Sequence, residues 1–134
     1  MGLVHLAGPD LAAQLDAAVA YSGDEWNDDA VWFRTPSIDR IAEFLQADPV
    51  LDFQFLNSIS AVDYIGYFEV VYHLTSFRQR HTATIKSKIP GRGEPVVPSV
   101  YGVWRGADFQ EREVWDLMGI RFDGHPNMKR IMLW

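Results

Sequence analysis

Histidines and carboxylates are the residues with which this sequence could do acid–base or metal chemistry, because it contains no cysteine. The missing cysteines exclude disulfides, iron–sulfur ligation, thiolate zinc sites and cysteine nucleophiles. Two of the four histidines, His73 and His81, flank a predicted hairpin. The apolar residues of the two strands lie at even and odd positions respectively, so pairing the apolar sets sends His73 to one face and His81 to the other. We therefore expect no metal site there.

The carboxylates Glu111, Glu113 and Asp116 lie on one short predicted helix. A catalytic pair must converge across a cleft, whereas positions 111 and 113 do not face each other on a helix. Arg112 and Asp116 instead have the spacing of an i,i+4 ion pair. His125, between a glycine and a proline, is interpreted as a turn residue that hydrogen-bonds locally or at a partner surface. With no nucleophile elbow or dinucleotide-binding glycine pattern, we expect no self-contained active site.

The elements that position these residues follow from the apolar spacing. The pattern predicts helices over 10–21, 35–48 and 108–118 and strands over 30–34, 51–59, 68–74 and 81–88. The inward residues of the strand over 51–59 are predicted to be Leu51, Phe53, Phe55, Asn57 and Ile59. This order predicts an α+β fold: one domain over 1–134, a sandwich of a mainly antiparallel sheet with helices packed on one face. The run Pro90–Pro95 is predicted to be an irregular loop.

The last predicted helix has recognisable ends. Asp108 is a suitable N-cap, and Glu111 three residues later has the spacing of a capping box. Gly119 is the expected C-terminal stop, in a left-handed conformation. The apolar face is predicted to consist of Val114, Leu117 and Met118.

The net charge and the length of the chain limit the classes of protein to which it can belong. The chain has 134 residues, enough for one domain, and a net charge of −6 with a pI near 5.0, which disfavours a general nucleic-acid binder. Residues 1–60 hold ten acidic and two basic residues, whereas residues 61–104 hold three acidic and five basic ones. The first basic residue is Arg34 and no apolar run approaches membrane-spanning length, so we expect neither a secretion signal nor a transmembrane helix.

Tryptophan and arginine alternate toward the end of the chain. The set comprises Trp104, Trp115 and Trp134 with Arg105, Arg112, Arg121 and Arg130. These are the anchor residue types of protein interfaces, so we expect a partner surface between Trp104 and Arg130.

The stretch over 111–132 resembles the pattern E-R-E-x-[YW]-D-x-x-G-I-x-F-x-G-H-P-x-x-x-R-I-[LM] of the C subunit (the 30-kDa subunit) of bacterial NADH:quinone oxidoreductase, respiratory complex I. The stretches 61–64, 68–74 and 97–104 are also similar to this family, and the resemblance extends from about residue 30 to the end. It implies a partner interface carried by Trp104, Glu111, Arg112, Glu113, Trp115, Asp116, Gly124, His125, Pro126 and Arg130.

The resemblance also implies a biological setting. The chain is expected to be a non-catalytic subunit of the peripheral arm, at the cytoplasmic face of the bacterial plasma membrane. It is expected to bind no cofactor, while other subunits hold NADH, FMN, the iron–sulfur clusters and quinone. Its expected partners are chiefly subunits D, B and I. The alternative function is the equivalent subunit of a membrane-bound nickel–iron hydrogenase or related dehydrogenase.

Overall fold

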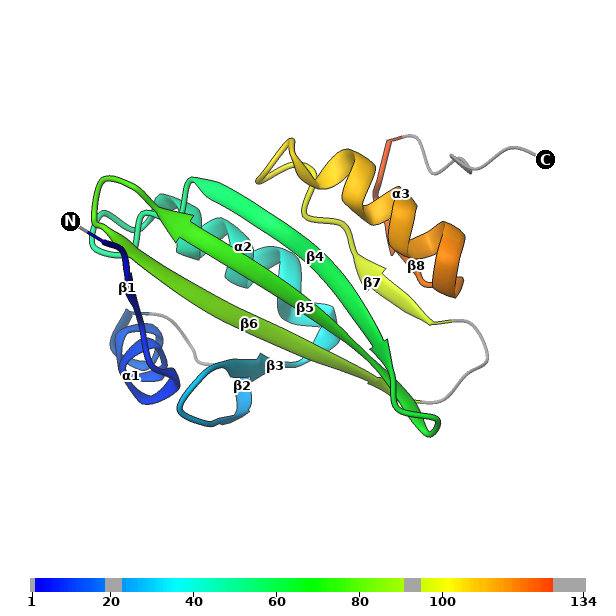
Figure 1. Ribbon diagram of the computed structural model, residues 1–134, viewed down its shortest axis with the longest axis horizontal. Helices are drawn as coiled ribbons and strands as arrows, with labels where there is room; N and C mark the ends of the chain where they lie inside the picture. Colours follow the sequence, from blue (N-terminus) through cyan, green and yellow to red (C-terminus); the bar gives the residue numbers. More distant parts are fainter. Residues whose placement is uncertain (1, 19–22, 91–94, 127–134) are drawn as a thin grey trace.

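A computed structural model describes residues 2–18, 23–90 and 95–126 (Figure 1). Its elements in chain order are β1 (Val4–His5), α1 (Gly8–Ala18), β2 (Gly23–Trp26), β3 (Val31–Phe33), the 3₁₀ turn η1 (Thr35–Ser37), α2 (Ile38–Ala47), β4 (Phe55–Asp63), β5 (Tyr67–Ser76), β6 (His81–Pro90), β7 (Val96–Pro98), α3 (Ala107–Met118) and β8 (Arg121–Asp123). No helix within this described part of the chain has the length and apolar character needed to cross a membrane.

The main sheet has the strand order β2-β3-β6-β5-β4. The long strands β4, β5 and β6 form two successive antiparallel pairs, and β2 is antiparallel to β3. Both β1 and β3 run parallel to β6, β1 at its start and β3 further along. A small second sheet pairs β7 with β8 in parallel. The predicted α+β class with a mainly antiparallel sheet is confirmed.

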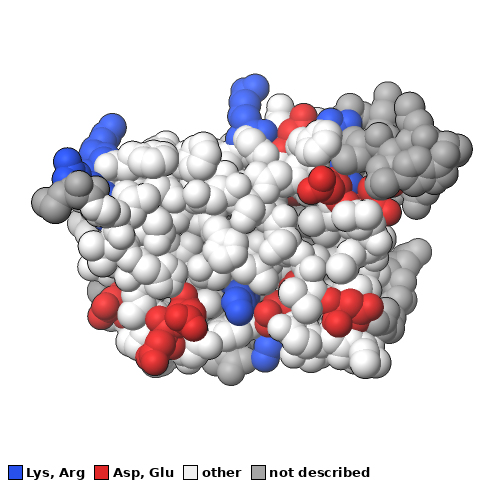
Figure 2. Space-filling model, viewed as in Figure 1, with Lys and Arg blue, Asp and Glu red and all other residues white. Residues whose placement is uncertain are grey.

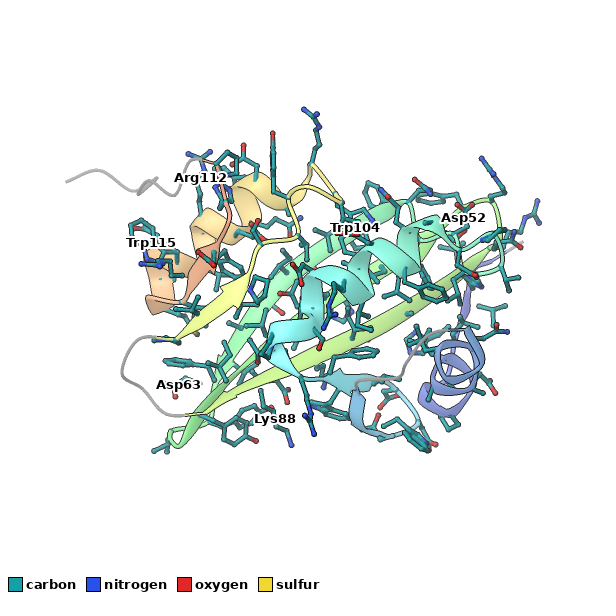
Figure 3. The ribbon with its side chains drawn as sticks, turned by 180° about the vertical axis from the view of Figure 1, so that it is seen from behind. Asp52, Asp63, Lys88, Trp104, Arg112 and Trp115 are labelled. Atoms are coloured by element: carbon teal, nitrogen blue, oxygen red, sulfur yellow. The ribbon has the colours of Figure 1, made fainter. Side chains whose placement is uncertain are left out.

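Helix α2 lies across one face of the long strands, while α1 lies beside β1–β3 and α3 beside β4 (Figures 1 and 3). In α2, Ile38, Ile41, Ala42 and Leu45 are buried, as their i, i+3, i+4, i+7 spacing predicts. They join one continuous core with the inward residues of β5 and β6, among them Tyr72. None of the described helices lies on the opposite face of β4–β6.

The hairpin of β5 and β6 has the predicted register. His73 pairs with Thr84, and His81 pairs with Ser76. Because residues alternate between faces along a strand, His81 shares the core face with Tyr72 and His73 lies on the open face. The two imidazoles therefore cannot hold a metal between them.

Strand β4 corrects one prediction. It begins at Phe55, and a register shift between Leu56 and Ser58 breaks the simple alternation. Leu56 and Ile59 are buried, whereas Phe55 and Asn57 are exposed. The prediction that Phe55 and Asn57 point inward was wrong, because a bulge changes the phase of a strand without a signal in its alternation.

Other boundaries moved by a few residues. Helix α1 begins at Gly8, so Asp10 lies in its first turn rather than at its cap, and the predicted continuation over 19–21 falls outside the described residues. The predicted loop of Pro90–Pro95 begins with the last residue of β6, and residues 91–94 also lie outside the described part.

Helix α3 keeps its predicted end but not its predicted start. Gly119 follows it with φ 75° and ψ 11°, and its N–H donates to the Trp115 carbonyl, which confirms the left-handed stop. At the other end Gly106 is the N-cap, and no side chain caps the helix. The buried residues are Ala107, Glu111 and Val114, whereas Leu117 is 67% exposed, so the predicted apolar face was wrong at Leu117.

Candidate functional site

The resemblance placed the functional residues around α3, and Glu111 occupies the centre of that region. Its side chain is fully buried. One carboxylate oxygen accepts a hydrogen bond from the Ser99 hydroxyl at 2.6 Å, and the other accepts one from the Val100 N–H at 2.8 Å. Glu111 therefore ties α3 to the segment that follows β7. The predicted capping box was wrong, because these tertiary hydrogen bonds turn Glu111 inward.

The electrostatics of Glu111 reflect this position. Burial raises the pKa of the carboxyl group above its ordinary value, while the hydrogen bonds from Ser99 and Val100 and the nearby His125 act in the opposite direction. Tyr72 of β5 is also affected: its own burial, and then the Glu111 carboxylate, raise the pKa of its hydroxyl group. The Glu111 carboxylate is thus near enough to Tyr72 for its charge to affect that hydroxyl group.

His125 forms the second contact of this region. Its ring is fully buried, with Nε2 3.1 Å from Asp108 Oδ1, 3.2 Å from the Asp108 carbonyl oxygen and 4.0 Å from Glu111 Oε1. Asp108 also pairs with Arg112 Nε at 3.3 Å. The predicted partner of Arg112 was Asp116, and the structure shows Asp108, one turn earlier. We name Ser99, Asp108, Glu111, Arg112 and His125 the α3 clasp.

The α3 clasp joins three segments that are separate in sequence. The residues after β7 enter through Ser99, α3 supplies three members, and the turn after β8 supplies His125. The Tyr101 ring packs against the His125 ring with centroids 5.8 Å apart. These contacts hold α3 against the segments that follow β7 and β8.

The ten residues predicted as a partner interface divide by exposure. Trp104 is buried and donates its indole N–H to the Phe53 carbonyl at 2.8 Å, and Glu111 and His125 are buried in the clasp. Exposed residues are Glu113, Gly124 and Pro126; partly exposed ones are Arg112, Trp115 and Asp116. Arg130 lies outside the described residues. The buried members can support a partner surface from beneath, and the exposed ones can form it.

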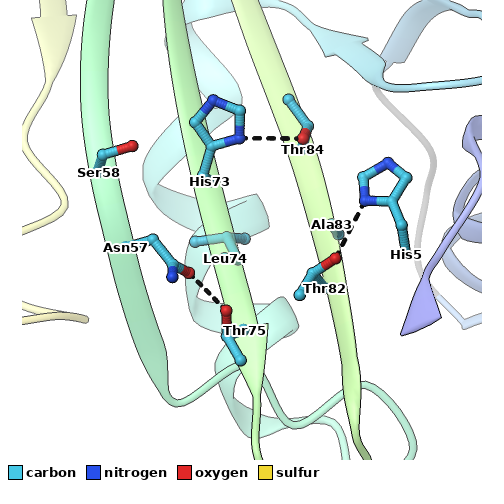
Figure 4. A pocket seen from close by; sticks show the side chains of 9 residues that line it. All are labelled: His5, Asn57, Ser58, His73, Leu74, Thr75, Thr82, Ala83 and Thr84. Atoms are coloured by element: carbon cyan, nitrogen blue, oxygen red, sulfur yellow. Dashed lines mark hydrogen bonds between the residues drawn. The ribbon is translucent and has the colours of Figure 1, made fainter. Parts of the chain in front are cut away.

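A pocket of about 320 Å³ lies on the open face of the sheet (Figure 4). Its lining residues are His5, Asn57, Ser58, His73, Leu74, Thr75, Thr82, Ala83 and Thr84. The histidines lie near hydroxyl groups, with His5 Nδ1 3.1 Å from Thr82 Oγ1 and His73 Nδ1 3.2 Å from Thr84 Oγ1. Burial, then Lys86 and His5, lower the pKa of His73. The lining holds no carboxylate, and no three potential metal ligands converge anywhere in the described part of the chain.

Sequence reasoning missed two features. Ser99 and Val100 are twelve and eleven residues from Glu111, and no local pattern connects them. Glu69 is nearly buried on the open face, where it accepts a hydrogen bond from the Trp32 indole N–H at 2.7 Å and lies 3.7 Å from Lys86 Nζ. These contacts come from β3 and β6, and the alternation within one strand carries no information about them.

Comparison with known proteins agrees with the signature around α3. The family model described as respiratory-chain NADH dehydrogenase, 30 Kd subunit, matches residues 31–134. The C subunit of the NADH-quinone oxidoreductase of Roseiflexus sp. is 42% identical over 126 residues, which cover 92% of this chain and 72% of that protein. The C 2 subunit of the Rhizobium meliloti enzyme is 46% identical over 101 residues, which cover 72% of this chain and 54% of that protein.

Solved structures agree with this result. A trypsin-resistant fragment of Nqo5 superposes with a TM-score of 0.60 at 29% identity, covering 73% of this chain and 80% of that one. The structure of the membrane-bound sulfane sulfur reductase, an archaeal respiratory membrane complex, contains a chain that superposes with a TM-score of 0.71 at 27% identity, covering 94% of this chain and 75% of that one. This chain therefore belongs to the 30-kDa subunit family of respiratory-chain NADH dehydrogenase.

Proposed function

We propose that this chain is the C subunit of a bacterial NADH:quinone oxidoreductase and acts there as a structural subunit. The observation that carries the proposal is its identity of 42% with the C subunit of the Roseiflexus NADH-quinone oxidoreductase over 92% of the chain. The structure of the site supports the proposal, since three residues of the family pattern, Glu111, Arg112 and His125, belong to the α3 clasp. In this role the chain supports electron transfer from NADH to quinone while other subunits hold FMN, the iron–sulfur clusters and quinone.

The proposed partners are chiefly subunits D, B and I, in a peripheral arm at the cytoplasmic face of the plasma membrane. The proposed contact is the exposed side of α3 with the turn that follows β8, around Glu113, Trp115 and Pro126. Support comes from the rigidity of this region, because the clasp fixes α3 before any partner binds. A preorganised surface loses less conformational entropy on association.

A second candidate is the equivalent subunit of a related membrane-bound redox complex, such as a nickel–iron hydrogenase. The likeness to the chain from the sulfane sulfur reductase complex, over 94% of this chain, favours keeping it. The identities of 39–46% with NADH-quinone oxidoreductase subunits favour complex I.

The test is assembly of the whole complex around a tagged copy of this chain. We expect the tagged chain to co-purify with cluster-bearing subunits and with NADH:quinone activity. Glu113→Arg should weaken that co-purification, whereas the matched charge reversal Glu43→Arg, at an exposed position of α2, should leave it unchanged. Recovery of a hydrogenase module in place of NADH oxidation would select the second candidate, and recovery of the chain alone would refute both.

A further inference from the structure

Two loops meet at the end of the molecule that lies away from α3 (Figure 1). One is the connection 48–54 between α2 and β4, and the other is the turn 77–80 between β5 and β6. Three side-chain contacts join them: Gln79 Nε2 donates to the Pro49 carbonyl at 3.0 Å, His81 Nε2 to the Leu51 carbonyl at 2.6 Å, and Arg78 Nε lies 3.6 Å from Asp52 Oδ2. The loops therefore form one joined platform.

The backbone of this platform is held in an unusual conformation. Asp52 has φ 46° and Arg80 has φ 57°, in the left-handed region that residues other than glycine seldom adopt. Asp52 is held there by its N–H, which donates to the Asp48 carbonyl at 2.7 Å, and by Gln54 Nε2, which donates to its Oδ1 at 2.9 Å. Such conformations persist where the surroundings over-determine them, and they gather at functional surfaces.

The platform presents large apolar side chains to solvent. Phe55 is 48% exposed, Phe77 64% and Val50 55%. The two phenylalanine rings contact each other, with centroids 5.6 Å apart. Two adjacent phenylalanines and a valine left in water forgo the free energy that their burial would release. Exposed apolar clusters of this kind, bordered by polar groups, mark interaction sites.

Basic side chains border these apolar residues. Arg78 and Arg80 are both exposed, the Arg78 side chain to 81% even though its Nε faces Asp52. Figure 2 shows blue side chains gathered at this end, beside a surface with few charges. The same loops also hold Asp48 and Asp52, but these carboxylates accept hydrogen bonds within the platform and neither residue is fully exposed, so the exposed charges here are the two arginines. A guanidinium group pairs well with carboxylates, so the charge favours a partner with acidic groups.

We propose that Val50, Phe55, Phe77, Arg78 and Arg80, together called the apolar end, form a second docking surface of this chain. The partner is a neighbouring protein subunit with an apolar pocket bordered by Asp or Glu residues. The inference rests on the proposed function, because it needs a multi-subunit complex. It goes further by naming a surface away from α3 and the chemistry that fits it. Aromatic and arginine anchors on a rigid base are typical of such interfaces.

The first test is assembly of the complete complex with a tagged neighbouring subunit. The double variant Phe55→Ala/Phe77→Ala is compared with Tyr64→Ala, which removes an equally exposed ring from the other end of the same sheet. We expect the double variant to co-purify about 30-fold less strongly, as for loss of interface anchors. Tyr64→Ala should co-purify like the unmodified chain. Equal recovery of the double variant and the unmodified chain overturns the inference.

A charge reversal tests the acidic rim independently of packing. Arg80→Glu should reduce co-purification at least tenfold, whereas Arg40→Glu, at an exposed position of α2, should not. Thermal unfolding of the free chain shows whether the double alanine variant folds. If it does not fold, the comparison of Arg80→Glu with Arg40→Glu still tests the inference. If Arg80→Glu assembles normally, the partner has no acidic groups that face Arg80, and the inference is overturned.

A thiol probe reports contact directly, because the chain has no cysteine of its own. In Phe77→Cys, the thiol should react with a maleimide at least tenfold more slowly in the assembled complex than in the free chain. Equal rates overturn the inference while leaving the proposed function intact.

Two experiments on the free chain test other occupants of the apolar end, and a positive result in either overturns the inference. Binding of the free chain to vesicles with 30% anionic lipid, lost in Phe55→Ala/Phe77→Ala, would assign the surface to a membrane. A dimer of the free chain, lost in that variant, would assign it to a second copy. Failure of the unmodified chain to co-purify refutes the proposed function itself.

Discussion

Replacing Glu111 tests whether the α3 clasp holds this part of the fold together. The carboxylate is fully buried and accepts two hydrogen bonds, from Ser99 and Val100. Hydrogen bonds to charged groups contribute about 1.5–3 kcal/mol each, so Glu111→Ala should lower the free energy of unfolding by about 3–6 kcal/mol. That is a large fraction of the roughly 5–15 kcal/mol typical of a domain. The melting temperature should fall by more than about 10 °C.

The matched variant Glu111→Gln separates geometry from charge. The glutamine carbonyl can still accept from the Val100 N–H, and its amide can donate to the Ser99 oxygen. Since burial disfavours the carboxylate charge, removing that charge should cost only about 1 kcal/mol. Thermal unfolding of the free chain, followed by circular dichroism, measures both variants against the unmodified chain.

The pH dependence of the same variants follows from the sign of the pKa shift. The pKa of Glu111 is raised in the folded state, so the native chain binds this proton more tightly than the unfolded chain. The part of the stability that is linked to this proton is therefore complete below the ordinary pKa of 4.5 and is lost as the pH rises through the folded-state pKa. Glutamine does not titrate. The advantage of the unmodified chain over Glu111→Gln should thus shrink as the pH rises from below 4.5.

Two results would refute this reasoning. If Glu111→Ala costs less than about 0.5 kcal/mol, the carboxylate behaves like an ordinary surface residue and the clasp does not stabilise the domain. If the advantage over Glu111→Gln grows as the pH rises, the hydrogen bonds and His125 outweigh burial, and the direction given for the pKa is wrong. Glu113→Gln, an exposed neighbour on α3, is the control and should change neither quantity.

Three further predictions follow from the same structure. Gly119→Val should lower the free energy of unfolding by at least about 1–2 kcal/mol, because φ is 75° there, whereas Gly102→Val should not introduce this strain. Equal melting temperatures of the two variants would contradict the left-handed conformation of Gly119. Gly8→Ala should cost about 1–3 kcal/mol, since a Cβ would collide with the carbonyl oxygens of Asn27 and Ala30, and thermal unfolding without a change would contradict this close approach. The purified chain should carry no stoichiometric metal, flavin or cluster; elemental analysis and a visible spectrum check this, and one metal per chain would contradict it.

The regular elements were predictable from sequence wherever a repeating apolar pattern had to face one core. The α2 face and the opposite orientation of His73 and His81 follow from periods of about 3.6 and 2. The prediction failed where one local event overrides the period, as the bulge in β4 does for Phe55. It failed again at Glu111, because its spacing from Asp108 predicted a capping box at the start of the helix. Partners twelve residues away decide that side chain's direction, and spacing along one helix carries no information about them.

The candidate site was predictable as a stretch of sequence but not as an arrangement in space. The family pattern over 111–132 suggested a docking surface, because charged and aromatic residues are usually solvated or bound to partners. The structure instead buries Glu111 and His125 beneath the exposed side of α3. Exposure could not be inferred from residue type, since a buried carboxylate needs hydrogen-bond donors that only the folded chain brings to it.

The α3 clasp gives a physical reason for the long and specific signature in the last part of the chain. A docking helix on the edge of a sheet binds a partner well only if its pose is fixed beforehand, because ordering it on association would consume binding free energy. In this chain α3 contacts β4, and the Gln110 side chain accepts from the Ile59 N–H at 2.6 Å on the outer edge of that strand. Glu111 and His125 then fasten the helix to the segments on its other side. The two sets of contacts constrain α3 from opposite sides, so substitution of a buried clasp residue should weaken partner binding through the loss of a fixed helix. It should do so without removing any atom that the partner touches.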